Sequence, residues 1–168
     1  MKKAAVVMGL LMAWLVVNPG LWSQDKDRAE LAKAVAEAKV SLEQGLSVGA
    51  HEGKPISAKF EIEDGKLQLS VYTGKGDTFS EVVVDHTTGK AAKTEPITSG
   101  EDLSAARTQS EAMAKAKQSL HATLIKVLKV NPGFRAASIF PVLKDGHPIA
   151  EVTLTKGDEW KTVSEKLD

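Results

Sequence analysis

The sequence contains no cysteine, and this absence excludes several classes of protein at once. Without cysteine there is no disulfide framework, no thiolate zinc site, no thiol nucleophile and no lipid anchor attached to cysteine. The chain also lacks an excess of charge of one sign, because 22 Lys and Arg residues balance 22 Asp and Glu residues. Nucleic-acid binding normally needs a basic face, so this balance argues against nucleic acid as a partner.

The long uncharged apolar run near the start of the chain is too short for a typical membrane span. It covers residues 4–17, whereas a transmembrane helix needs about 20 apolar residues. Two lysines precede the run and an Asn-Pro-Gly breaker ends it, which is the layout of a secretory signal. We therefore predict a signal peptide over residues 1–23 and no stable membrane span after its cleavage. An uncleaved N-terminal anchor is the alternative.

The rest of the chain contains one sequence unit twice. Residues 34–42 recur as residues 112–120, with six of nine positions identical at an offset of 78. An offset of 81 then relates two turns, an Asp-Gly pair at residues 64–65 and a Lys-Gly-Asp triplet at residues 75–77, to their second copies. Chance is a poor explanation for two separate turns matching in the same order, so we interpret the pattern as an internal duplication.

Each copy begins with a helical period and continues with the period of strands. Apolar residues recur every three or four positions and predict one long helix per copy, whose apolar face in the first copy is formed by Leu31, Val35, Ala38, Leu42 and Leu46. The period then changes to two, which indicates antiparallel strands joined by glycine-containing turns. The expected strands cover residues 56–62, 67–71, 79–84 and 90–94 in the first copy, and 135–143, 148–155 and 160–166 in the second.

These elements predict an α+β fold of two tandem units, each a long helix packed on a three- to four-stranded antiparallel sheet. The first unit covers residues 25–95 and the second covers residues 103–168, with a linker at residues 96–102. A unit of about 70 residues has only a small core. We therefore expect the two units to pack together and to unfold as one.

The last strand of the second unit is expected to have an unpaired side, since no fourth strand follows it. Such an edge accepts an extended segment of a partner. Lys161, Glu165 and Lys166 lie on this strand, and charges on an edge also protect it against aggregation. We favour the protective role.

The first unit resembles the PepSY domain family. The resemblance rests on the alanine-rich helix, the Asp-Gly hairpin and the sequence EVVVDHTTGK at residues 81–90, which is similar to the family's strand-and-turn ending. The motif positions are Val82, Val84, Asp85, Thr88 and Gly89. The resemblance covers residues 28–93 well and residues 104–168 less well, because the second unit has no Thr-Gly ending and carries two prolines in its strands.

The resemblance implies an exported or membrane-bound bacterial module. Such domains occur in the propeptides of secreted metallopeptidases, where they restrain the peptidase, and many stand alone. For Asp85, Thr88 and Gly89 we expect a structural role in the turn, because Asp and Thr side chains bond the local backbone and Gly adopts positive φ. Together with the predicted signal peptide, the resemblance places the protein in the bacterial envelope, as a periplasmic or secreted protein.

A search for catalytic chemistry in the sequence finds no set of residues that supports an enzyme. The four histidines lie far apart, at positions 51, 86, 121 and 147, and none has metal-ligand spacing. No serine is placed to complete a triad with His86 and Asp85. The glycine-rich segment at residues 74–76 leads into a strand and so lacks the helix N-terminus of a phosphate loop. We predict no catalytic residue, no cofactor and no metal site.

The sequence therefore predicts an exported, non-enzymatic protein-interaction module. Its expected partner is another envelope or secreted protein, and the resemblance suggests a peptidase that the module modulates or inhibits. The alternative is a periplasmic module that binds a small ligand or a metal, through the groove between the units or through the histidines.

Overall fold

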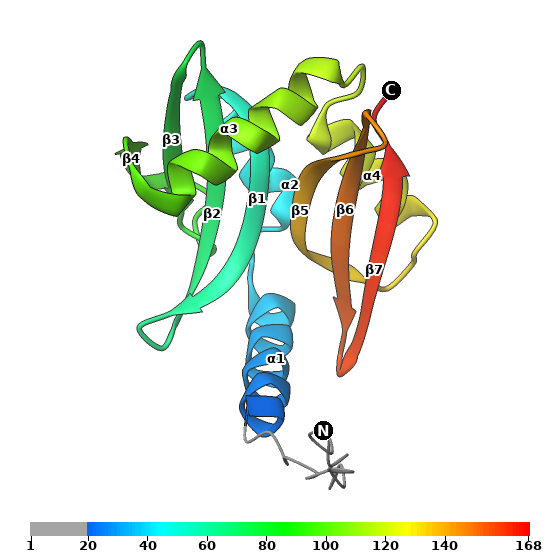
Figure 1. Cartoon of the computed structure of the whole chain (residues 1–168). Helices are drawn as coiled ribbons and strands as arrows, with labels where there is room; N and C mark the ends of the chain where they lie inside the picture. The colour runs from blue at the N-terminus through cyan, green and yellow to red at the C-terminus, as the bar shows by residue number, and fades with distance from the viewer. Residues whose placement is uncertain (1–19) are drawn as a thin grey trace, which may run out of the picture.

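One seven-stranded antiparallel sheet passes through both halves of the protein, in the order β4-β3-β2-β1-β5-β6-β7 (Figure 1). The computed structural model describes the backbone of residues 20–168 and the side chains of residues 26–168. The strands are β1 (Lys54–Glu63), β2 (Lys66–Lys75), β3 (Thr78–Val84), β4 (Ala91–Ile97), β5 (Arg135–Lys144), β6 (His147–Lys156) and β7 (Glu159–Lys166). The helices are α1 (Gly20–Glu37), α2 (Leu42–Gly49), α3 (Gly100–Lys115) and α4 (Leu120–Lys129).

The α+β class agrees with the sequence, but the predicted arrangement of two tandem units, each a long helix on its own three- to four-stranded sheet, is wrong. The finding that overturns it is the pairing of β1 with β5, which joins the strands of both copies into one sheet. Of the predicted linker, residues 96–97 belong to β4 and residues 100–102 belong to α3. Residues 1–19 of the predicted signal peptide lie outside the described residues, and its last four residues belong to α1.

Each long helix that the sequence predicted is two helices with a short break. Ser41 caps α2, because its hydroxyl accepts from the Gln44 N–H at 3.3 Å while the Gln44 side chain accepts from the Ser41 N–H at 2.8 Å. Ser119 caps α4 in the same position, accepting from the Ala122 N–H at 3.1 Å. The apolar spacing continues across both breaks, so the period of the sequence concealed them, whereas the capping serines were the available signal.

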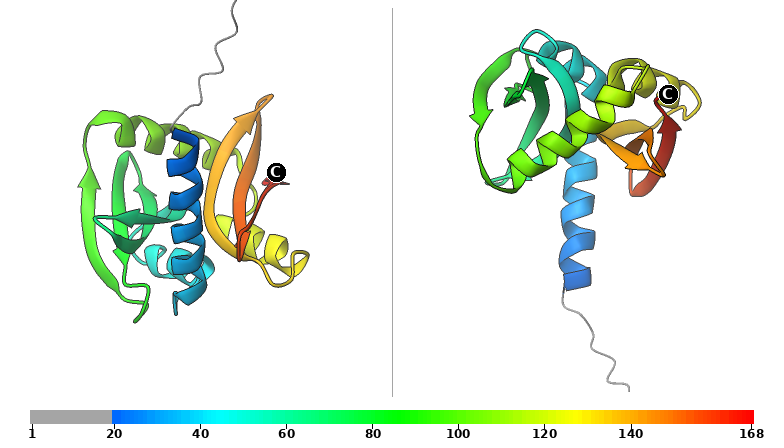
Figure 2. Two further views of the ribbon diagram at one scale, coloured as in Figure 1. Left: turned by 90° about the horizontal axis from the view of Figure 1, so that it is seen from below. Right: turned by 45° about the horizontal axis from the view of Figure 1, so that its top comes forward.

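The junction between the two halves is short. Only two residue pairs, Ala58 with Ile139 and Lys59 with Ser138, define the pairing of β1 and β5. Beyond these pairs the two strands diverge, and α1 lies at one of the two openings (Figure 2). Both long helices, α1 and α3, contact β1, β2, β5 and β6. Each long helix therefore packs on strands from both copies.

Two basic residues at matching positions tie each half to the long helix of the other. Arg135 at the start of β5 donates from its guanidinium to the carbonyl oxygens of Ala36, at 3.1 Å, and Ala38, at 2.9 Å, at the end of α1. Lys54, which matches Arg135 at the offset of 81, donates to the carbonyl oxygen of Met113, at 3.0 Å, in the last turn of α3. A cation at a helix C-terminus satisfies free carbonyl groups and opposes the negative end of the dipole.

The short helices α2 and α4 contact each other. They cover the back of the sheet, the face opposite the one that α3 crosses in Figure 1. α2 approaches β2 closely because it carries glycine: a Cβ built on Gly45 meets the Leu69 side chain at 2.8 Å, and one on Gly49 meets the Val71 side chain at 2.4 Å. Thr123 occupies the position of Gly45 in the second copy, and Ala150 occupies that of Leu69. The two copies thus fill the same space with different pairs of residues.

Thr123 gives a stability prediction, because its hydroxyl is fully buried and has no hydrogen-bond partner among the described residues. An unsatisfied buried hydroxyl costs about 1–3 kcal/mol. Replacement of Thr123 by valine keeps the branched shape and removes the hydroxyl, so we expect the free energy of unfolding to rise by about 1 kcal/mol. Chemical denaturation measures this change. A clear loss of stability would show that the hydroxyl has a partner, such as a buried water.

Candidate functional site

The turn after β3 carries the residues that resemble the PepSY ending. The Asp85 carboxylate accepts from the N–H groups of Thr87, at 2.8 Å, and Thr88, at 3.0 Å. The backbone hydrogen bonds from Thr88 and Thr87 lower the pKa of Asp85 below its ordinary value. Gly89 has φ of +71° and donates from its N–H to the Asp85 carbonyl oxygen at 2.8 Å. These contacts close a tight turn through backbone and side-chain hydrogen bonds.

This turn holds the break between α1 and α2. The carbonyl oxygen of His86 accepts from the N–H groups of Lys39, at 3.0 Å, and Val40, at 2.9 Å. In the second copy Leu167 takes over this role, since its carbonyl oxygen accepts from the N–H groups of Lys117 and Gln118, at 2.7 and 3.0 Å. The other two motif residues, Val82 and Val84, are 0% and 1% exposed and belong to the core. All five motif residues therefore have structural contacts that account for them.

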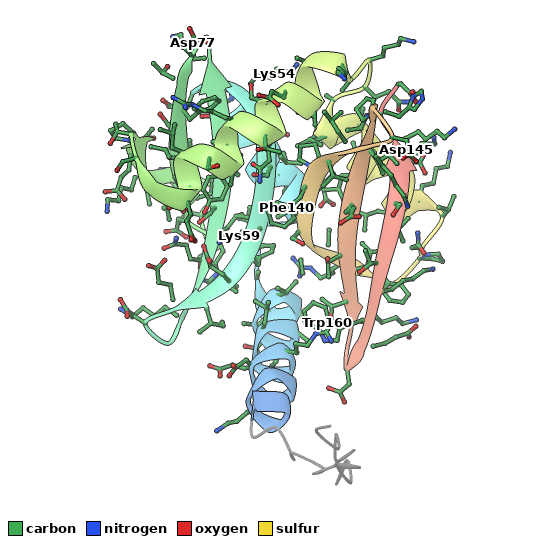
Figure 3. The ribbon with its side chains drawn as sticks, viewed as in Figure 1. Lys54, Lys59, Asp77, Phe140, Asp145 and Trp160 are labelled. Carbon is green, nitrogen blue, oxygen red and sulfur yellow. The ribbon has the colours of Figure 1, made fainter. Side chains whose placement is uncertain are left out.

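A network of polar side chains lies on the front face of the sheet, the face that α3 crosses in Figures 1 and 3. Lys59 on β1 forms an ion pair with Glu61 at 2.6 Å. On β2, the Tyr72 hydroxyl donates to Glu81 on β3 at 3.4 Å. Gln68 and Ser70 link the two carboxylates: Gln68 donates to Ser70 at 3.0 Å and to Glu81 at 3.4 Å, and Ser70 donates to Glu61 at 3.3 Å. We call these six residues the front-face network.

A small cavity borders the front-face network. Its volume is about 130 Å³, and its lining includes Lys59, Tyr72, Gln109 of α3 and Phe140 of β5. Gln109 also accepts from the buried Ser57 hydroxyl at 2.7 Å, which fixes α3 over β1. Figure 3 shows Lys59 and Phe140 between α3 and α1. The cavity thus lies at the junction of the two halves and is formed by residues from both.

The ionisation of Tyr72 reports on this network. Burial raises the pKa of Tyr72 to about 12, and the negative charges of Glu81 and Glu61 add to the effect, while Lys59 opposes it. Burial disfavours the charged form of Lys59, but the hydrogen bond from its ammonium group to Glu61 and the contacts with Tyr72 outweigh this, so the pKa of Lys59 is raised. At neutral pH the network therefore holds a protonated tyrosine and a charged lysine.

Tyr72 is the only tyrosine in the chain, so an ultraviolet titration reads its pKa directly. We expect a midpoint of about 12 in the folded protein and about 10 in denaturant. Because the folded pKa lies above the unfolded one, Tyr72 contributes stability that is fully present below about pH 10. That contribution is lost as the pH rises through about 12. Glu81→Gln removes a negative charge and should lower the folded midpoint, whereas equal midpoints in both states would contradict the network.

Sequence reasoning missed the front-face network. It singled out none of these six residues as a candidate site residue. The strand period did place Lys59 and Glu61 on one face, opposite the apolar residues of β1. What the sequence could not supply was the register of β2 and β3, which brings Tyr72 opposite Glu81 and Ser70 opposite Lys59.

The histidines do not come together in the structure. Within residues 26–168 no group of three or more His, Asp or Glu side chains has an arrangement that holds a metal ion. The His147 side chain forms a hydrogen bond, with its Nδ1 2.8 Å from the carboxylate of Asp168. This contact joins the start of β6 to the residue after Leu167. It lies at the surface, with the His147 side chain 70% exposed.

Comparisons with known proteins give little further information. No protein-family profile matches the sequence, and no curated protein matches it. A solved structure with a similar shape is a protein from Clostridium difficile 630 described as a "putative lipoprotein". Its TM-score is 0.42 at 14% identity, over 79% of this chain and 89% of that one. At this level the neighbour defines neither a family nor a function, and the resemblance to the PepSY family stays untested.

The described helices give no membrane span. Among residues 20–168, none of the helices combines the length and the apolar character that crossing a membrane requires.

Proposed function

We propose that this chain is an exported, non-enzymatic protein-binding module of the bacterial envelope, and that its binding surface is the front face between α1 and α3. The observation that carries the proposal is the front-face network together with Phe140. These residues form a half-buried, mixed aromatic and charged surface to which both halves contribute. A peptidase is the partner class that the resemblance to the PepSY family suggests, and binding would restrain its activity.

The network supports protein binding because its side chains are already ordered. Lys59 and Glu61 are 31% and 30% exposed and are held by their ion pair. Tyr72 is fixed between the Lys59 ammonium, 5.8 Å from the ring centre, and Glu81. Ordered side chains lose little entropy on binding, and tyrosine is enriched among the residues that dominate protein interfaces. The surface therefore has the composition and the rigidity of an interface centre.

The cavity beside Tyr72 is small for a ligand pocket. A cavity of about 130 Å³ lies below the range of about 300–1,000 Å³ that is usual for ligand pockets. A partner side chain that enters it would contact Tyr72 and Phe140 while its backbone lies across the face.

The test is an affinity capture from the native envelope fraction with three versions of the full chain as bait: the unchanged protein, Tyr72→Ala and Lys129→Ala. Lys129 is an exposed residue at the end of α4, on the opposite face of the sheet, and serves as the control. We expect a partner that the unchanged protein and Lys129→Ala retain and that Tyr72→Ala loses by at least about tenfold. If the partner is a peptidase, titration with the module should then reduce its activity.

Two results would count against the proposal. Equal retention by Tyr72→Ala, with its melting temperature unchanged, would show that the partner binds another surface. The absence of any specific partner would remove protein binding as the main role. Native mass spectrometry of the same sample, read for a bound small molecule or metal, would then test the alternative function.

A further inference from the structure

The outer edge of β7 differs from that of β3, its counterpart in the first copy. β7 is the second copy of β3 at the offset of 81, and the outer edge of β3 pairs with β4. Within residues 20–168, β7 pairs with β6 alone. Matching residues are more exposed on β7: Phe79 and Val82 of β3 are buried, whereas Trp160 and Val163 at the same positions of β7 are only half-buried. The first copy therefore serves as a template for a strand added to β7.

The charged residues of β7 do not simply guard this edge. Lys161 donates to Asn131 at the end of α4 at 2.7 Å. Glu165 forms an ion pair with Lys126 of α4. Two of the three charges that the sequence suggested as protection against aggregation are thus held in fixed positions against α4, on one face of the sheet. Their fixed positions make the edge selective for a strand with a complementary charge pattern.

The sequence of β7 is complementary to itself when two copies run antiparallel. When Val163 faces Val163 of a second copy, each residue a given number of positions before Val163 faces the residue the same number of positions after it. Lys161 then lies opposite Glu165, Thr162 opposite Ser164, and Trp160 opposite Lys166. Each pair occurs twice because of the two-fold symmetry. Opposite charges, hydroxyl pairs and a cation beside an aromatic ring all stabilise facing positions in antiparallel strands.

Neighbouring registers lose this match. A shift that keeps the same faces together centres the pairing on Thr162 or on Ser164. The first places Glu159 opposite Glu165, and the second places Lys161 opposite Leu167, so that neither Lys161 nor Glu165 faces an opposite charge on the added strand. The charge pattern thus selects both the partner and the register.

We propose that β7 pairs antiparallel with β7 of a second copy of this chain, centred on Val163, to form a two-fold symmetric dimer with a continuous sheet. The front-face surface is not involved in this pairing, because its residues lie on β1, β2, β3, β5 and α3 and none lies on β7. The dimer therefore presents two front faces and is independent of the proposed function.

The test uses charge reversal in the full chain, with mass measured by light scattering and sedimentation. We expect the unchanged protein to reach twice its monomer mass of 17.9 kDa. Lys161→Glu and Glu165→Lys each place like charges opposite one another twice, so each variant alone should dimerise at least about tenfold more weakly. An equal mixture of the two variants restores both opposite-charge pairs and should return to the dimer mass.

A charge reversal on the other edge of the sheet is the control. Lys93 on β4 forms an exposed ion pair with Glu95, and Lys93→Glu should leave the mass unchanged. A monomeric unchanged protein at high concentration would overturn the proposal. A dimer that survives both single variants, or a mixture that stays monomeric while circular dichroism shows folded variants, would overturn the β7 interface and its register.

Discussion

Replacement of Gly45 by threonine is expected to destabilise the protein by about 3 kcal/mol. A Cβ at this position lies 2.8 Å from Cδ2 of the Leu69 side chain, which is fully buried. Overpacking of a dense core typically costs about 1–3 kcal/mol, and a branched side chain adds to the clash. Leu69→Ala alone should also destabilise, by about 2–5 kcal/mol, because it leaves a cavity.

The double variant Gly45→Thr, Leu69→Ala should be more stable than either single variant, because it copies the pair that the second half uses, Thr123 and Ala150. Equilibrium denaturation of the four proteins gives the coupling energy directly. The reciprocal pair, Thr123→Gly with Ala150→Leu, is the matched control in the other half. If the effects of the two substitutions on the free energy of unfolding simply add, the pair Gly45–Leu69 and the pair Thr123–Ala150 are not interchangeable.

Removal of the Arg135 side chain is expected to lower the free energy of unfolding by about 2 kcal/mol. Its guanidinium donates to the carbonyl oxygens of Ala36 and Ala38 and reaches that of Val40 at 3.5 Å. Hydrogen bonds from a charged group contribute about 1.5–3 kcal/mol each at most, and the carbonyl groups left behind partly regain water. Arg135→Ala would therefore loosen the end of α1, which this residue holds from the opposite half.

Two further substitutions place this result in context. Lys54→Ala removes a single hydrogen bond, to Met113, and should cost about half as much. Arg107→Ala removes an exposed arginine of α3 and should change stability by less than about 0.5 kcal/mol. An Arg135→Ala protein as stable as Arg107→Ala would contradict the role of this residue in joining the halves.

The duplication was the part of the fold that the sequence predicted best. Repeated turns fix backbone conformation locally, and the structure repeats them: Asp64 and Asp145 both have positive φ, at 50° and 52°. The strands also lie close to their predicted ranges, because alternation of apolar and polar residues requires only local information. The breaks in the helices were missed because Leu42 and Leu120 continue the apolar spacing although a capping serine precedes each of them.

The joining of the two sheets could not be read from the sequence. It depends on two residue pairs between β1 and β5, which are more than 75 positions apart and carry no pattern that distinguishes an inner strand from an edge. The candidate site depends on the same information, because Phe140 comes to lie near Lys59 and Tyr72 only when the halves meet. Local patterns therefore predicted the elements, whereas the site required the long-range register.

The most direct test of the account is calorimetric unfolding of the full chain. The two copies form one sheet with reciprocal helix contacts, so we expect that neither copy is stable alone. We predict a single transition whose calorimetric and van't Hoff enthalpies agree, and which Arg135→Ala shifts to lower temperature as a whole. Two separate transitions, or a shift of only part of the transition in Arg135→Ala, would contradict the claim.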